Sequence, residues 1–132
     1  YQSIIVHYVK TKHSDEEMSR LITPKTPFVP DFNKVDVNVL MEKNMDSVDK
    51  FDRYLMKLSN GDFRMPTLFK KYLKINAKFL CFNVDPDFNN TLDGLLFLRF
   101  EDYPKEELMM LIKDNTPEEK ARYAARFGIS LD

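Results

Sequence analysis

The stretch from Asn83 to Gly94 carries the side chains in this chain that are best suited to chemistry. It reads NVDPDFNNTLDG and contains the carboxylates of Asp85, Asp87 and Asp93. Carboxylates at a strand end can act as general bases when burial or like charges raise their pKa. Asp and Asn also build tight turns, because their side chains accept hydrogen bonds from nearby backbone N–H groups. The stretch therefore fits an acid–base site or a turn, and the turn is the commoner role of these residue types.

A calcium loop is the third possibility for the same residues. Asp85, Asp87 and Asn89 alternate like the first three ligands of the twelve-residue calcium loop that joins two helices. The position that requires glycine is Asn90, however, and the position that requires a bidentate glutamate is Leu96. The flanking sequences also favour strands over helices. The sequence thus argues against calcium, and we expect no metal site.

Composition limits the class of protein. The chain has 132 residues, which fits one domain, and 43% of them are hydrophobic, which is typical of a globular chain. Its net charge is -1, so it lacks the clustered positive charge that binds duplex nucleic acid. No apolar run approaches the roughly 20 residues of a membrane-spanning helix. We expect a cytoplasmic domain that binds no nucleic acid.

Soft ligands and nucleophiles are scarce. Cys81 is the only cysteine, and with His7 and His13 it makes too few ligands for a structural zinc site. Cys81 lies in an apolar run, which indicates an inert core residue, and a single cysteine fits a reducing compartment. The three glycines stand far apart, so no glycine-rich phosphate loop is present.

A basic edge is predicted on a helix that begins at Pro66. Lys70, Lys71 and Lys74 fall on its polar side, where they could meet a phosphate or an acidic carrier protein. A solvated charged face is the commoner role of such lysines. The apolar residues expected on the buried side of this helix are Leu68, Phe69, Tyr72 and Leu73.

Apolar spacing predicts an α+β fold, with helices packed on one face of a short antiparallel sheet. Two short apolar runs, 78–84 and 92–100, predict neighbouring antiparallel strands joined by the acidic stretch. Residues 21–36 contain three prolines and predict an extended connector. Helical spacing and stop signals predict helices at 3–12, 47–58, 66–75, a short one from Pro104, and 117–127.

Residues at the expected helix ends support these boundaries. Asp46 or Ser47 suits the N-cap of the second helix. Thr116 and Glu119 have the spacing of a capping box, and Gly128 suits the end of the last helix. The first helix, in contrast, begins without a convincing cap.

Residues 65–98 resemble a known family. They read MPTLFKKYLKINAKFLCFNVDPDFNNTLDGLLFL and are similar to the C-terminal signature of a bacterial group labelled hemolysins. That group resembles the ornithine- and glycine-lipid N-acyltransferases and, more distantly, the acyl-homoserine-lactone synthases, which have a GNAT-like fold. The residues that match its pattern are Lys71, Tyr72, Asn83, Asp85, Asp87, Phe88, Asp93 and Gly94.

The resemblance implies acyl transfer. The amine of an amino acid or amino lipid would attack an acyl thioester carried by acyl carrier protein or coenzyme A, with no other cofactor. Such a reaction needs a base and donors for the oxyanion. The candidate catalytic residues are Asp85 and Asp87, and the candidate substrate-binding residues are Lys70, Lys71, Asn83 and Asp93.

The resemblance also implies a domain organisation. The segments IIVHYVKTKH and LITPKTPF also resemble the piece that precedes this signature in the family, so the match covers roughly residues 1–100. Residues 1–103 would then form the C-terminal half of a GNAT-like domain and residues 104–132 a helical extension of it. The activity of this chain on its own is left open, and the resemblance allows peripheral contact of the intact protein with the inner membrane. The alternative is a non-catalytic interaction or dimerisation module that uses the helix of Lys70–Lys74 or an unpaired sheet edge. Membrane lysis is disfavoured, because no strongly basic amphipathic segment is present.

Overall fold

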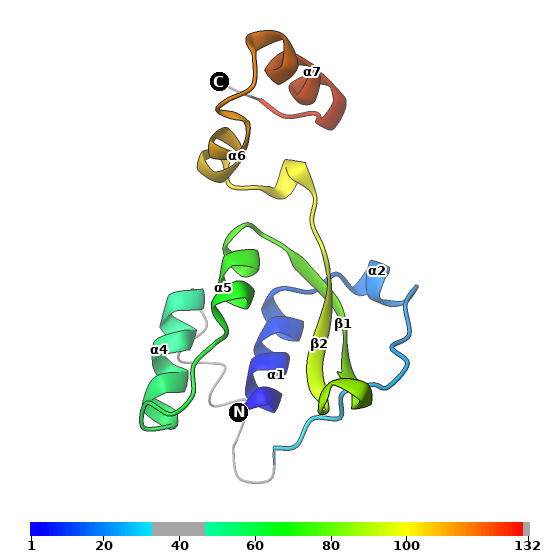
Figure 1. The fold of residues 1–132 in the computed structure, drawn as a ribbon, viewed down its shortest axis with the longest axis vertical. Helices are drawn as coiled ribbons and strands as arrows, with labels where there is room; N and C mark the ends of the chain where they lie inside the picture. Colours follow the sequence, from blue (N-terminus) through cyan, green and yellow to red (C-terminus); the bar gives the residue numbers. More distant parts are fainter. Residues whose placement is uncertain (33–46, 131–132) are drawn as a thin grey trace.

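A computed structural model describes residues 1–32 and 47–130 and shows a mixed fold of helices and one hairpin (Figure 1). The two strands form an antiparallel sheet, which confirms the predicted α+β class. The elements, in chain order, are α1 (Gln2–Lys12), α2 (Glu16–Ser19), α4 (Val48–Leu58), α5 (Thr67–Lys74), β1 (Lys78–Asp85), β2 (Thr91–Phe97), α6 (Lys105–Ile112) and α7 (Pro117–Phe127), with short 3-10 helices at Pro86–Phe88 and Phe100–Asp102.

Helix α1 forms the centre of the core. It lies between the α4–α5 pair and the hairpin in Figure 1, and it buries residues on most of its circumference, including Val6 and Tyr8. The Tyr8 ring stacks on Phe51 of α4 with centroids 4.0 Å apart. The predicted helix at 3–12 is confirmed, as is its lack of a side-chain cap at Tyr1.

The hairpin packs against the core through Phe79 and Phe82 of β1. Strands β1 and β2 pair with Phe82 opposite Gly94 and Asn83 opposite Asp93, so the predicted antiparallel neighbours are confirmed. The prediction that the second strand reaches residue 100 was wrong, because β2 ends at Phe97, opposite the first residue of β1. Phe100 instead lies in a 3-10 helix, where its ring is 4.8 Å from the ring of Phe127.

The extended connector covers the free edge of β1. The N–H of Phe28 donates to Phe82 O (3.2 Å), and the N–H of Val84 donates to Thr26 O (2.8 Å). The prediction of an extended, non-helical connector is confirmed for residues 21–32, whereas residues 33–36 lie outside the described residues. In the part of the chain that the structure describes, no strand pairs with the opposite edge of the sheet, along β2.

Helix α4 begins and ends as its sequence predicts. Ser47, one of the two expected caps, accepts a hydrogen bond from the N–H of Lys50 (3.1 Å), and Asp46 lies outside the described residues. Asn60 and Gly61 then adopt positive φ values of 54° and 88°, which a helix-ending turn requires.

Helix α5 departs from the prediction in two respects. Pro66 is its N-cap and not its first helical residue, since its ψ of 137° is extended. Leu68 was expected to be buried but is 60% exposed, whereas Leu73 is 1% exposed. These two residues lie about 140° apart around a helix, so only one of them can face α1 and β1.

Helices α6 and α7 follow the hairpin and lie beyond its end in Figure 1, apart from α1, α4 and α5. The predicted capping box is present: Thr116 and Glu119 exchange hydrogen bonds of 3.0 and 3.2 Å. Gly128, with φ 65°, ends α7 as predicted. A bond from Asn76 Nδ2 to Asp102 O (2.7 Å) links the end of α5 to the segment that precedes α6.

Candidate functional site

The acidic stretch forms the turn of the hairpin, and we refer to Asn83, Asp85, Asp87 and Asp93 together as the hairpin rim. Asp85 Oδ1 accepts a hydrogen bond from the N–H of Asp87 (3.0 Å). Asn89 and Asn90 both have φ 54°, the left-handed conformation that a tight hairpin turn needs. Asp and Asn residues therefore build this turn, as one of the interpretations of the sequence predicted. The acid–base interpretation remains a hypothesis for those carboxylates that are exposed to solvent.

The two candidate catalytic carboxylates, Asp85 and Asp87, differ in their exposure and in their hydrogen bonds. Asp85 is half-buried and its side chain caps the 3-10 helix that follows it. Asp87 is exposed, and of the two it is the carboxylate that an approaching amine could reach. The Asp85 side chain thus fixes the backbone at Asp87 through a hydrogen bond within the turn.

Asn83 and Asp93 are opposite each other in the sheet and project from the same face. Asn83 Oδ1 accepts a 2.7 Å hydrogen bond from the N–H of Thr26, so this side chain anchors the connector to β1. Asp93 is exposed. Of the two candidate binding residues of the hairpin rim, Asp93 is thus accessible to a ligand, whereas the side-chain oxygen of Asn83 already accepts a hydrogen bond from the connector.

The described residues contain no cluster of three or more His, Cys, Asp or Glu side chains that could hold a metal ion. Over those residues, moreover, no helix combines the length and apolar character that a membrane crossing would need.

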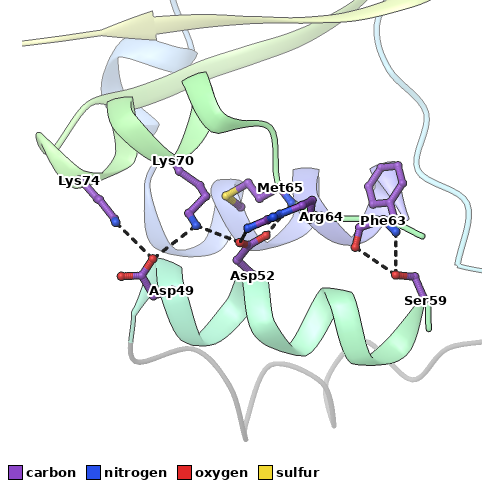
Figure 2. A network of polar contacts seen from close by, with 8 residues as sticks. All are labelled: Asp49, Asp52, Ser59, Phe63, Arg64, Met65, Lys70 and Lys74. Atoms are coloured by element: carbon purple, nitrogen blue, oxygen red, sulfur yellow. Dashed lines mark hydrogen bonds and ion pairs between the residues drawn. The ribbon is translucent and has the colours of Figure 1, made fainter. Parts of the chain in front are cut away.

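Two lysines of the predicted basic edge, Lys70 and Lys74, contact acidic residues of α4 (Figure 2). Lys70 Nζ lies 2.9 Å from Asp52 Oδ2 and 3.5 Å from Asp49 Oδ1, both on α4. Lys74 Nζ lies 3.2 Å from Asp49. Lys71 is exposed and remains accessible to a ligand. Much of the predicted basic edge is therefore used to join α5 to α4.

Asp52 is the residue at the centre of this arrangement that the sequence analysis did not identify. The residue is only 3% exposed, and its carboxylate accepts hydrogen bonds from the N–H of Met65 (2.7 Å), from Lys70 Nζ (2.9 Å) and from Arg64 Nη2 (3.4 Å). We call these groups the α4–α5 clasp. The signal in the sequence was an aspartate directly after Phe51 in the apolar stripe of α4, on the side expected to be buried.

The charges of the clasp stabilise one another. Burial raises the pKa of Asp52, but the hydrogen bonds from Lys70 and from the Met65 N–H outweigh it, so its pKa is lowered. The hydrogen bond to Asp52 in turn raises the pKa of Lys70. At neutral pH both groups are charged, and the clasp joins two helices without offering a free group for catalysis.

A partly buried polar pair lies at the end of α1. His13 Nε2 is 3.3 Å from the hydroxyl of Tyr8, and burial raises the pKa of that hydroxyl. Burial, together with the nearby charges of Lys78 and Lys12, lowers the pKa of His13 to about 4. His13 is therefore neutral in the folded protein at neutral pH.

The neutral state of His13 predicts a loss of stability in mild acid. The unfolded chain binds a proton at His13 near its ordinary pKa of 6.5, but the folded chain does so only near 4. Stability should be constant above pH 6.5, fall as the pH drops from 6.5 to about 4, and change no further from this group below that. A fully buried group with this difference in pKa would contribute about 3 kcal/mol, but His13 is only half-buried, so solvent screening reduces the expected loss to about 2 kcal/mol. Urea unfolding at several pH values measures it.

Variants isolate the contribution of His13. His13→Gln should flatten the dependence above about pH 4.5, where few carboxylates titrate. Tyr8→Phe removes the hydroxyl partner but keeps the ring, and it should preserve the slope. An unchanged slope in His13→Gln would show that another group causes the acid sensitivity.

Comparisons with known proteins add no identification. No family model, no curated protein and no solved structure matches the chain. The function proposed below therefore rests on the residues of the chain and their arrangement.

Proposed function

We propose that the chain is part of an N-acyltransferase that moves a fatty acyl group from a carrier thioester to the amine of an amino acid or amino lipid. The observation that carries the proposal is the hairpin rim, where Asp87 is exposed on a turn fixed by the Asp85 side chain and Asp93 is exposed on the adjoining strand β2. The residue pattern that resembles the N-acyltransferase family falls on this same hairpin.

The proposed reaction has a simple balance. The amine nitrogen attacks the thioester carbonyl carbon, the C–N bond forms, and the C–S bond breaks to release the carrier thiol. Asp87 takes the proton that the amine loses, and this proton finally resides on the departing thiol. Asp85 holds the backbone of Asp87 in place, and Lys71 contacts the acidic surface or phosphate of the carrier.

The experiment uses this chain and, in parallel, its full-length gene product. Each is incubated with acyl carrier protein or coenzyme A thioesters of several chain lengths and a panel of amino acids and amino lipids. Mass spectrometry then detects N-acyl products. Asp87→Asn should lower turnover by about 10²-fold or more, the usual contribution of a general base. Asp85→Asn should retain most activity, since an amide oxygen can accept the same hydrogen bond from the Asp87 N–H.

Two results would reject the proposal. Amide formation could be absent for every thioester and acceptor with both proteins. Alternatively, product could form at the same rate with Asp87→Asn, which would place the base elsewhere.

A non-catalytic interaction module is the second candidate, and one observation favours it. The backbone groups of Phe82 and Val84 bond to the connector and so point away from β2. Residues opposite each other in an antiparallel pair point their backbone groups either both inward or both outward. The N–H and C=O groups of Leu92, Gly94 and Leu96 therefore point away from β1, along the outer edge of β2. No other described strand pairs with this edge. An extended peptide could add to it. Such binding without any amide formation in the assay above would favour the module.

A further inference from the structure

The outer edge of β2 carries backbone groups that form no hydrogen bond with another described residue. The N–H and C=O groups of Leu92, Gly94 and Leu96 point away from β1, and none of the backbone bonds outside the strand pair involves them. The edge along β1, in contrast, is bonded to the connector through Thr26 and Phe28. An edge with free donors and acceptors is a template for one more strand.

The side chains of β2 divide between the two faces of the sheet. Leu92 and Leu96 pack against the core, so the helices cover one face and not the edge. Asp93, Leu95 and Phe97 alternate with them and lie on the other face, where Leu95 is 47% exposed. Strand β2 also contains no lysine or proline, the residues that commonly block pairing at an exposed edge.

We propose that the edge of β2 pairs with β2 of a second copy, antiparallel to it, so that two hairpins form one four-stranded sheet across a two-fold axis. The inference concerns the edge that the non-catalytic candidate function uses, and it does not depend on acyl transfer. Hydrogen bonds require that residues with outward backbone groups lie opposite one another. Two or more of Leu92, Gly94 and Leu96 do so only when the axis passes through residue 93, 94 or 95.

The side chains select one of these three registers. An axis at Asp93 places the two Asp93 carboxylates opposite each other, which is unfavourable. An axis at Gly94 places each Leu95 opposite an Asp93 carboxylate. An axis at Leu95 places the two exposed Leu95 side chains opposite each other in a non-hydrogen-bonded pair, where side chains approach most closely. The strand therefore complements itself best about Leu95.

The same register brings opposite charges together. Asp93 then lies opposite the partner's Phe97, and within each chain the Arg99 guanidinium lies 5.2 Å from the centroid of the Phe97 ring. A guanidinium stacked on a ring keeps its N–H groups free for a carboxylate, so Asp93 meets the partner's Arg99. Neither Asp93 nor Arg99 forms an ion pair with another described residue.

Sedimentation equilibrium of the whole chain from about 10 µM to 1 mM tests for the dimer, with a dissociation constant expected on the order of 100 µM for so small a contact. Nuclear magnetic resonance over the same range locates the interface. The amide protons of Gly94 and Leu96 should shift with concentration, because the partner strand accepts hydrogen bonds from them. The amide protons of α4 should not shift.

Charged residues at position 95 test both the identity of the partner and the register. Leu95→Lys and Leu95→Glu should each weaken the dimer at least about tenfold, because each variant places two like charges opposite each other. An equimolar mixture of the two variants should dimerise with an affinity within about threefold of the wild type, since a lysine then faces a glutamate. Leu95 is largely exposed, so both variants should keep the fold, which circular dichroism verifies.

Leu68 supplies the matched control. It is also an exposed leucine, at 60%, but it lies on α5. Leu68→Lys and Leu68→Glu change the net charge as the Leu95 variants do, and they should alter the dissociation constant by less than about twofold.

Four outcomes would overturn the proposal. The chain could remain monomeric at 1 mM, roughly tenfold above the expected constant. The Leu68 variants could weaken the dimer as much as the Leu95 variants, or the mixture of Leu95 variants could fail to dimerise. A dimer whose concentration-dependent shifts fell on α6 and α7 and not on β2 would place the interface elsewhere.

Discussion

Asp52→Ala is expected to lower the free energy of unfolding by about 3 kcal/mol, close to the cost of breaking a buried ion pair. The substitution removes the acceptor for three donors of the α4–α5 clasp (Figure 2). The N–H of Met65 would then be buried without a partner, and Lys70, whose side chain is 21% exposed, would lose its closest opposite charge. Urea unfolding at neutral pH measures the loss.

The neighbouring Asp49 supplies the matched control. It pairs with Lys70 and Lys74 from the same helix face, but its side chain is 53% exposed, so water can replace these contacts. Asp49→Ala should therefore shift the urea midpoint only slightly. Asp52→Asn should fall between the two, because an amide oxygen still accepts from the Met65 N–H. Equal midpoints for Asp52→Ala and Asp49→Ala would show that the clasp contributes no more than a surface pair.

The sign of the Asp52 pKa shift adds a pH test. A carboxyl whose pKa is lowered on folding stabilises the protein above its unfolded pKa of 3.8, and that contribution is lost as the pH falls below 3.8 through the folded value. This window lies below most of the His13 window. The difference between wild type and Asp52→Asn should accordingly shrink only in strong acid.

Gly94→Val is expected to destabilise the fold by about 3 kcal/mol, at the upper end of the usual cost of overpacking a core. A Cβ at this position would lie 2.7 Å from Phe79 Cε1 and 2.9 Å from Phe79 Cδ1. Phe79 is 2% exposed, stacks on Phe82 and contacts the ring of Phe69, so it cannot easily turn aside. Thermal and urea unfolding measure the effect, and Gly94→Ala should give a smaller loss of the same sign.

A compensating change identifies the cause. Phe79→Leu removes the ring atoms nearest to the new Cβ, so the double variant Gly94→Ala, Phe79→Leu should lose less stability than the sum of its single changes. Strict additivity would show that the clash with Phe79 is not responsible. Gly94 is one of the residues on which the family resemblance rests, and close packing alone explains why a glycine stands there.

Local signals in the sequence predicted most elements of the fold. Ser47, Thr116 and Gly128 act at helix ends as their types and positions indicated, because capping depends on bonds within a few residues. The pairing of the two apolar runs followed from their composition and the turn residues between them. The end of β2 was missed, since it depends on where β1 begins and on the contact between Phe100 and Phe127.

The sites were less predictable, because their chemistry depends on long-range contacts. Asp85 could be proposed as a turn former, since its partner is two residues away. The partner of Asn83 is the N–H of Thr26, 57 residues earlier in the chain, and no local pattern reveals it. Lys70 likewise looked free in sequence, because its partners Asp49 and Asp52 belong to a different helix.

The connector that borders β1 has a consequence for the order of folding. A two-stranded ribbon alone is only marginally stable in water, and here Thr26 and Phe28 reach it across more than fifty residues of intervening chain. Closing so long a loop costs entropy before its contacts form, whereas α6 and α7 are joined by adjacent residues and need no such closure. The C-terminal helical pair can therefore acquire its structure early, while the edge of the sheet is completed only when the N-terminal segment arrives.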